Sequence, residues 1–243
     1  MAKYVFTDGK LFIGGYDLSS HTNAITLDVT ADELDVTTIN SGGGGFRERL
    51  GGLKDSSLSI DGFFEAGSEK PDALLGANIG NELIVTVVPD AGVGNIAYFL
   101  KSKLFSYQIL GSVGEIAPFN ISKSNSTDKV VRGTIDIDSA ITASGNSTGV
   151  QLGAVASTEN IYAAVHCTGV SGTSTPTITI TLESDDNASF TSATTIATFT
   201  DITAISSEIK KVSGAITDDY FRFAYTVSGT SPSFDIHATF GIE

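Results

Sequence analysis

The sequence predicts an all-β protein with one short helix, and three observations support this prediction. Apolar residues make up 41% of the 243 residues, which is enough for a hydrophobic core. Thr, Ser, Val, Ile and Gly dominate over Leu, Glu, Lys and Met, a balance that favours strands. Several segments alternate apolar and polar residues with the period of two that is typical of strands.

The first half of the chain contains six segments that we expect to form a sheet. Residues 83–88, for example, form a nearly continuous apolar run that ends at Pro89. One other segment, residues 70–77, has the pattern of a helix, because Pro71 comes early and Asp72 lies in the first turn. The expected strands are residues 24–30, 57–63, 83–88, 97–107, 119–123 and 129–137.

A glycine-rich arm, residues 38–55, separates the first two expected strands. It spans about 18 residues where a hairpin connection usually has about 2 to 5, and it has no core pattern of its own. Its three basic and two acidic residues give a net charge of +1, whereas the whole chain carries −14. We therefore expect the arm to bind another copy of the chain. The expected contact residues are Gly42, Gly43, Gly44, Gly45, Phe46, Arg47, Arg49, Leu50, Leu53 and Lys54.

The second half of the chain shows a clearer period of two. In residues 234–240, Phe234 and Ile236 are expected to face the core, and His237 and Thr239 the outer side. About seven strands at this spacing predict an Ig-like or jelly-roll-like β-sandwich. The assigned strands are residues 150–156, 161–167, 177–182, 194–199, 220–227 and 234–240.

A change in charge density divides the chain near residue 140. Residues 1–139 hold 11 basic and 18 acidic residues, whereas residues 140–243 hold 3 and 10. A polar Gly- and Ser-containing stretch follows residue 139. We therefore expect one domain over residues 1–139 and a second over residues 140–243.

The composition also excludes several classes of protein. With 14 basic and 28 acidic residues, the chain lacks the clustered positive charge that tight nucleic-acid binding requires. Cys167 is the single cysteine, so an internal disulfide is excluded. The sequence has no signal-peptide pattern and no apolar run of about 20 residues, so we expect synthesis in the cytoplasm and no membrane contact.

Enzyme-like and metal-like patterns are weak. Residues 145–149 match the G-x-S-x-G pattern around Ser147, but no helix follows, and the four glycines of the arm lack the ending of a phosphate-binding loop. His166 and Cys167 are adjacent and should point to opposite faces, which predicts an exposed histidine and a buried cysteine rather than metal ligands. We expect no catalytic activity and no cofactor. Residues 183–187 carry side-chain oxygens that can bind calcium, but Asp and Asn are also the usual residues of turns. A calcium site and an ordinary turn therefore both remain possible interpretations.

The order of several short motifs resembles a known family. Over residues 3–138 the chain resembles the major tail tube proteins of long-tailed, siphovirus-type bacteriophages, and residues 149–234 resemble C-terminal extensions of some members. The motifs are Thr7-Asp-Gly9, Ile13-Gly-Gly-Tyr-Asp-Leu-Ser19, Glu33-Leu-Asp-Val-Thr37, Gly51-Gly-Leu-Lys-Asp55, Leu58-Ser-Ile-Asp-Gly-Phe-Phe64, Gly149-Val-Gln-Leu-Gly-Ala154 and Ser228-Gly-Thr-Ser-Pro-Ser-Phe234.

The resemblance implies a structural role in the virion. Family members form a β-sandwich with a flanking helix, join into hexameric rings and stack into the tube through which DNA leaves. The long loop reaches a neighbouring subunit, and the C-terminal extension lies outside the tube. The implied partners are further copies of the chain, the tail terminator, tape-measure and distal tail proteins, and DNA in transit.

Acidic residues near the first two strands are candidates for lining the bore of such a tube, where they would repel DNA and let it slide. Ordinary solvated strand faces are the alternative explanation. A carbohydrate-binding or adhesin-like module is the alternative function, with a host-surface glycan as the ligand of the C-terminal half, although Trp is absent. The candidate lumen acids are Asp28, Asp32, Glu33, Asp35, Asp61 and Glu65.

Overall fold

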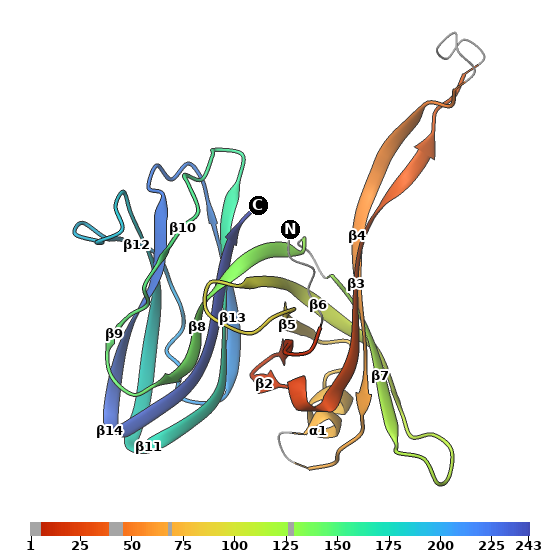
Figure 1. Ribbon diagram of the computed structural model, residues 1–243, viewed down its shortest axis with the longest axis horizontal. Coiled ribbons are helices and arrows are strands. Elements are labelled where there is room, and N and C mark those ends of the chain that lie inside the picture. The colour runs from red at the N-terminus through yellow and green to blue at the C-terminus, as the bar shows by residue number, and fades with distance from the viewer. Residues whose placement is uncertain (1–5, 39–45, 68–69, 126–128) are drawn as a thin grey trace.

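The computed structural model describes residues 6–38, 46–67, 70–125 and 129–243. These residues are mainly antiparallel β-strand with one α-helix, which confirms the predicted all-β class (Figure 1). Within these ranges, no helix has both the length and the apolar character that crossing a membrane requires. The elements are β1 Lys10–Ile13, β2 Tyr16–Asp17, the 3-10 helix η1 Ser19–His21, β3 Thr22–Asp35, β4 Arg49–Phe63, α1 Pro71–Ala77, β5 Glu82–Val88, β6 Ile96–Ile109, β7 Pro118–Asn125, β8 Val131–Ile141, β9 Gly145–Asn146, β10 Val150–Gln151, β11 Asn160–Asp185, β12 Thr194–Thr198, β13 Ser206–Ser213 and β14 Tyr220–Ile242.

The first half of the chain forms an antiparallel sheet in which each of the six expected strands is present. The strands follow the order β3-β4-β7-β6-β5-β1-β2. The helix α1 places Leu74 and Leu75 on a core that also contains Leu58, Ile60 and Ile121. Pro71 occupies the first turn of α1, as the sequence predicts, because its missing N–H needs no partner there.

The second half is built on two long strands, β11 and β14, that pair side by side along their lengths (Figure 1). The pairing turns a corner midway, where Gly172 and Gly229 have φ values of +126° and +105°. A side chain at Gly229 would meet the Cα atom of Pro176 at 2.8 Å, so glycine allows this close approach. Segments on both sides of the corner contribute to one core, which contains Ile161 and Ile178.

This corner explains two differences from the sequence prediction. Residues 161–167 and 177–182, expected as separate strands, both belong to β11, and residues 220–227 and 234–240 both belong to β14.

The strand β13 pairs with β11 but was not predicted, because its sequence Ser-Ser-Glu-Ile-Lys-Lys-Val-Ser does not alternate apolar and polar residues.

The strand β8 connects the two halves. It pairs with β6 through residues 131–134 and with β14 through residues 134–141. A small apolar cluster also crosses between the halves and joins Ile84 and Phe99 to Tyr162 and Ala164. The boundary that we expect near residue 140 therefore falls within β8, and the division into two domains remains a prediction.

The expected exposure of the histidines in the second half was wrong. His166 is fully buried and His237 nearly so, because the outer faces of β11 and β14 pack against β1 and β5 rather than facing water. The ring of Phe12 stacks on His237 at 4.1 Å between ring centres and lies 5.6 Å from the ring of His166. Thr239, expected on the same outer face, is buried as well.

Two polar contacts fix the ring of His166. Its Nδ1 lies 2.5 Å from the carbonyl oxygen of Gly14, so Nδ1 carries the hydrogen, and its Nε2 lies 2.8 Å from the hydroxyl of Thr86. Burial lowers the pKa of His166 to about 3. The imidazole is therefore neutral at pH 7 and serves as a structural link between the two halves.

Candidate functional site

The most conspicuous surface feature is the hairpin of β3 and β4, whose two strands extend away from the body of the molecule (Figure 1). Described residues 28–38 and 46–55 are exposed, apart from the half-buried Gly52. The outer part of this two-stranded ribbon stands in water, where a ribbon alone is at most marginally stable, so contact with another molecule would stabilise it. Large apolar side chains are exposed along it, namely Val29, Leu34, Val36, Phe46, Leu50 and Leu53.

The arm predicted between residues 38 and 55 is partly strand. Its residues 49–55 continue β4 and pair with residues 30–35 of β3, with Leu34 opposite Leu50. Phe46 and Leu53 expose 83% and 82% of their surface. Among the other arm residues, Gly42, Gly43, Gly44 and Gly45 lie outside the described residues, whereas Lys54 is exposed on β4 opposite Ala31.

Two cross-strand ion pairs neutralise the two arginines of the arm. Arg49 Nε lies 2.8 Å from Glu33 Oε1, and Arg47 Nη1 lies 3.6 Å from Asp35 Oδ2. Hydrogen bonds from Thr37 to the Asp35 carboxylate also lower the pKa of Asp35. The pairs are solvent-exposed, so each contributes little to stability, and their main effect is to fix the register of the hairpin.

The candidate lumen acids do not form one group. Glu33 and Asp35 belong to the ion pairs of the hairpin. Glu65 lies beyond the end of β4, and its carboxylate contacts Lys70 at 3.0 Å and His21 at 3.2 Å. Asp28 and Asp32 are exposed on β3. Asp61 is exposed on β4 and accepts a hydrogen bond of 2.6 Å from the side chain of Asn120 on β7.

The strand register does bring Asp28 and Asp61 to the same face of the sheet. Residues directly opposite each other in an antiparallel pair share a face, and Asp28 lies opposite Ser57, while Asp61 lies opposite Asn120. The positions between them on this face are small and polar. They are Thr26, Ser57, Ser59, Ser122 and Ser124.

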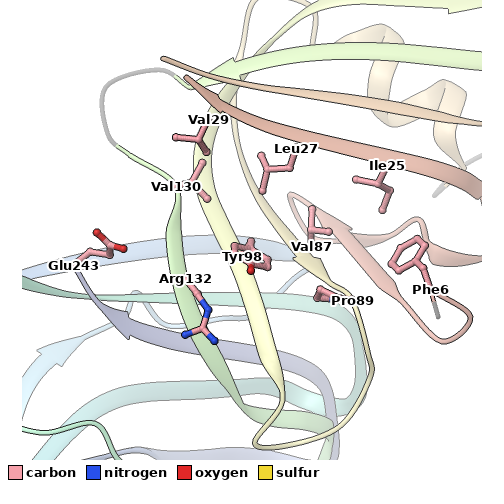
Figure 2. Close-up of a pocket in the computed structure, with 10 residues that line it drawn as sticks. All are labelled: Phe6, Ile25, Leu27, Val29, Val87, Pro89, Tyr98, Val130, Arg132 and Glu243. Carbon is pink, nitrogen blue, oxygen red and sulfur yellow. The ribbon is translucent and has the colours of Figure 1, made fainter. Parts of the chain in front are cut away.

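The other face of β3 opens onto an apolar groove of about 570 Å³ (Figure 2). Ile25, Leu27 and Val29 point into it from β3, and Val87 and Tyr98 face them from β5 and β6. Arg132 and Glu243 lie at its edge. An apolar strand face normally packs against a hydrophobic core, whereas this face of β3 is open to the groove. The groove is therefore a second apolar surface, beside the hairpin, that another molecule can contact.

The strand β3 also has an open edge. It pairs with β4, and in the part of the chain that the structure describes no second strand pairs with it. Its 14 residues therefore present a row of backbone N–H and C=O groups that another strand can bind. Sequence periodicity located β3 but gave no information on its edge position, which depends on the pairing of the whole sheet.

The enzyme-like and metal-like patterns have structural roles. Ser147 donates a hydrogen bond to Asp136 and accepts one from the backbone N–H of Phe223, so its hydroxyl anchors β9 on β14. The Asp185 carboxylate accepts hydrogen bonds from the backbone N–H groups of Asn187 and Ser192, as in a turn. Across the described ranges, no three His, Cys, Asp or Glu side chains gather to hold a metal ion.

Comparisons with known proteins give weak similarities. No family model and no curated protein matches the chain. A protein in the virion of a native gene transfer agent particle is 23% identical, with a TM-score of 0.37 over 49% of this chain and 92% of that one. The Dit protein of phage SPP1, described as a paradigm of the hub adsorption apparatus in phages that infect Gram-positive bacteria, is 11% identical, with a TM-score of 0.36 over 98% of this chain and 100% of that one. A type six secretion system protein is 14% identical, with a TM-score of 0.31 over 54% and 85%. Similarity at this level transfers no function to the chain.

Proposed function

We propose that the protein is a structural component of a phage-type virion tail, and that its copies join into rings that stack into a tube for DNA. The observation that carries this proposal is the projecting hairpin of β3 and β4. It exposes large apolar side chains, including Phe46 and Leu53, and touches little of its own body. These features support another molecule as its partner, and the resemblance of the sequence to tail tube proteins favours a second copy of the chain.

Ring closure uses the open edge of β3 and the groove beside it. A strand of the neighbouring copy that pairs with this edge satisfies its backbone groups, and the same neighbour covers Ile25, Leu27 and Val29. Closing a ring removes the exposed edges that would otherwise promote aggregation. We expect six copies in a ring, as the resemblance implies.

The polar face shared by Asp28 and Asp61 suits the bore of the tube. Small hydroxyl side chains and carboxylates dominate this face, which also carries the exposed Lys103 opposite Ser124, so the phosphate backbone of DNA is mainly repelled and held only weakly. The bore then acts as a smooth conduit. The tail terminator, tape-measure and distal tail proteins are the other partners that this role requires, and the second half of the chain lies outside the tube.

The alternative function, glycan binding by the second half, has less support. Carbohydrate sites usually present exposed aromatic rings, but Phe221, Phe223, Phe234 and Phe240 are buried. Tyr220 and Tyr225 are only partly exposed. The proposal of a host-surface glycan as partner therefore rests on the expected external position of this half alone.

Substitution at the tip of the arm tests the proposal. Phe46→Asp should raise the protein concentration needed for tube formation by at least about tenfold, because exposed aromatic anchors dominate interface energies. The measurement is light scattering with negative-stain electron microscopy. Val93→Asp is the matched control, since Val93 is also an exposed apolar residue but lies in the turn before β6.

The two variants have opposite expected outcomes. Val93→Asp should form tubes at the wild-type concentration, and both variants should keep the circular dichroism spectrum of a folded β protein. Unchanged tube formation by Phe46→Asp would contradict the role of the hairpin. Assembly that stops at single rings in the wild type would instead indicate a hub rather than a tube.

A further inference from the structure

The two halves of the chain meet at an interface beside β8. From the first half, β1 and β5 contribute Phe12 and Thr86, and from the second half, β11 and β14 contribute His166 and His237. Among the strands that the structure describes, β8 alone pairs with strands of both halves. Away from β8, this inter-half interface is therefore held by side-chain contacts rather than by strand pairing.

The inter-half interface is small and open to solvent at its edges. Its apolar cluster contains five buried residues, among them Ile84 and Ala164, whereas each half has a larger core of its own. A cavity of about 220 Å³ opens beside His237, and a second of about 450 Å³ opens between β5 and β13. Separation of the halves at this interface therefore leaves both larger cores intact and costs less than global unfolding.

His166 is the group at this interface that is least able to carry a charge. Its Nδ1 donates to the Gly14 carbonyl and its Nε2 contacts the Thr86 hydroxyl, and neither partner is charged. Full burial and, to a smaller extent, the ring of His237 lower the pKa of His166, and the two ring centres are 6.3 Å apart. His237 differs, because the Asp138 carboxylate lies 3.4 Å from its Nδ1 and can balance a positive charge.

The charged side chains at the edges of the interface do not compensate His166. Lys10 and Asp138 already form an ion pair at 2.7 Å, and Lys101 and Glu82 form one at 3.4 Å. Within the described ranges, no carboxylate contacts the ring of His166, so a charge on it is unbalanced. The charged residues that line the two cavities are Lys10 on β1, Asp17 on β2, Asp138 on β8, Asp235 on β14, Glu82 on β5, Lys101 on β6 and Glu208 on β13.

We propose that the inter-half interface is an acid-sensitive switch, in which protonation of His166 separates β1 and β5 from β11 and β14 while β8 keeps the halves connected. The closed interface excludes a proton that the exposed ring binds with a pKa near 6.5, so acid favours the open state. Lowering the pH from 7.5 to 4.5 should raise the ratio of open to closed molecules about 100-fold. The inference concerns contacts within one copy and does not depend on self-assembly.

Thiol labelling measures the opening. Ala164→Cys combined with Cys167→Ala places a single thiol in the interface, because Ala164 is fully buried in its apolar cluster. The reagent 4,4′-dithiodipyridine reacts with thiols in acid, and its labelling rate relative to that of the urea-unfolded chain gives the open fraction at each pH. This fraction should rise about 100-fold between pH 7.5 and pH 4.5.

Urea denaturation of the same variant gives the labelling rate that global unfolding alone allows. At pH 4.5 the interface thiol should label at least about tenfold faster than this rate, because local opening precedes unfolding. Ile84→Cys in the Cys167→Ala protein lies on β5, across the interface, and should show the same pH dependence. If both interface thiols label only at the rate that global unfolding allows, the halves do not separate and the inference is overturned.

The wild-type thiol shows whether the second half stays folded when the interface opens. Cys167 faces the core of the second half and should label no faster than global unfolding allows. Faster labelling of Cys167 would mean that the second half itself loosens, which also overturns the inference.

His166→Gln identifies the titrating group. In the protein with Ala164→Cys and Cys167→Ala, it should reduce the rise in open fraction to less than about tenfold, because an amide does not titrate and His237 alone remains. His21→Gln is the control, since His21 contacts Glu65 away from the interface, and it should leave the rise unchanged. A rise in His166→Gln as large as in its parent would contradict the role of His166.

Discussion

At the scale of single residues, the most informative side chain in the first-half core is Lys123. It lies on β7 opposite Leu58 and Leu104, and it is 1% exposed. Its ammonium nitrogen has no hydrogen-bond partner among the described residues. Burial lowers the pKa of Lys123 to about 8. At pH 7 the folded protein therefore contains a charged group without a partner, which is costly.

Replacing Lys123 with Met should stabilise the protein. We expect the free energy of unfolding at pH 7 to rise by about 2 kcal/mol, because the ammonium no longer has to be desolvated. The gain should shrink as the pH rises from about 8 to about 10, where the folded wild type carries a neutral amine. Urea denaturation at pH 7 and pH 10 measures this.

The control for this substitution is Lys103→Met on the neighbouring strand β6, at an exposed position. It should change the free energy of unfolding by less than about 0.5 kcal/mol. If Lys123→Met lowers stability at both pH values, the ammonium has a partner and the explanation is wrong.

The buried His166 makes stability depend on pH. Its folded-state pKa of about 3 lies below the ordinary value of 6.5, so the unfolded chain binds a proton that the folded protein excludes. Stability should therefore fall as the pH decreases below about 6.5, by about 3 kcal/mol at pH 4.5. Thermal unfolding of the wild type between pH 7.5 and pH 4.5 measures this slope.

His166→Gln should reduce that slope, because an amide can replace the contacts to Gly14 and Thr86 without titrating. His237 and Asp138 face the same cluster from β14 and β8, so part of the slope should remain. His21→Gln is the control, since His21 lies outside the cluster and contacts Glu65. A slope in His166→Gln equal to that of the wild type would show that His166 is not the titrating group.

At the scale of elements, Gly133 determines how β8 joins the two halves. A side chain at this position would meet the Phe240 carbonyl oxygen at 2.3 Å and the Phe99 ring at 2.8 Å. Gly133→Ala should therefore lower the free energy of unfolding by about 2 kcal/mol or more, because β14 must move away from β8.

Thermal unfolding of Gly133→Ala beside Gly51→Ala tests this. Apart from its two chain neighbours, no described residue has an atom within 4 Å of the position that a side chain at Gly51 would occupy, so Gly51→Ala should be nearly neutral. Similar melting temperatures for the two variants would show that β8 and β14 are not tightly joined at Gly133.

Sequence periodicity located the elements well where one face of a strand is buried. It predicted β3 to β8 and the helix α1, because their apolar positions repeat at the expected spacing, but it missed the short strands β1 and β2. It misplaced His166, His237 and Thr239, because β11 and β14 are covered on both faces and period two cannot distinguish a second buried face from water.

The candidate site was predictable only in part. The unusual length and glycine content of the arm identified it as a surface feature, and the exposure of Phe46, Arg47 and Leu53 agrees with that view. The pairing of Arg49 with Glu33 depends on strand register, and the groove beside Leu27 depends on strands far away in the sequence. Neither follows from local pattern.

At the scale of the whole molecule, the arrangement of surfaces is asymmetric. The outer parts of β3 and β4 and the hairpin of β6 and β7 extend toward opposite ends of the molecule, and β3 also has an open edge (Figure 1). Copies that each carry a formal charge of −14 repel one another, so contacts between them must come from apolar burial and strand pairing. Added salt should therefore favour assembly.

The most direct test of self-assembly is electron cryo-microscopy of the purified wild-type protein over a series of concentrations. Our prediction is closed rings that stack into tubes, with the hairpin of β3 and β4 extended onto a neighbouring copy. A protein that stays monomeric at every concentration, alone and with other tail proteins, would contradict it.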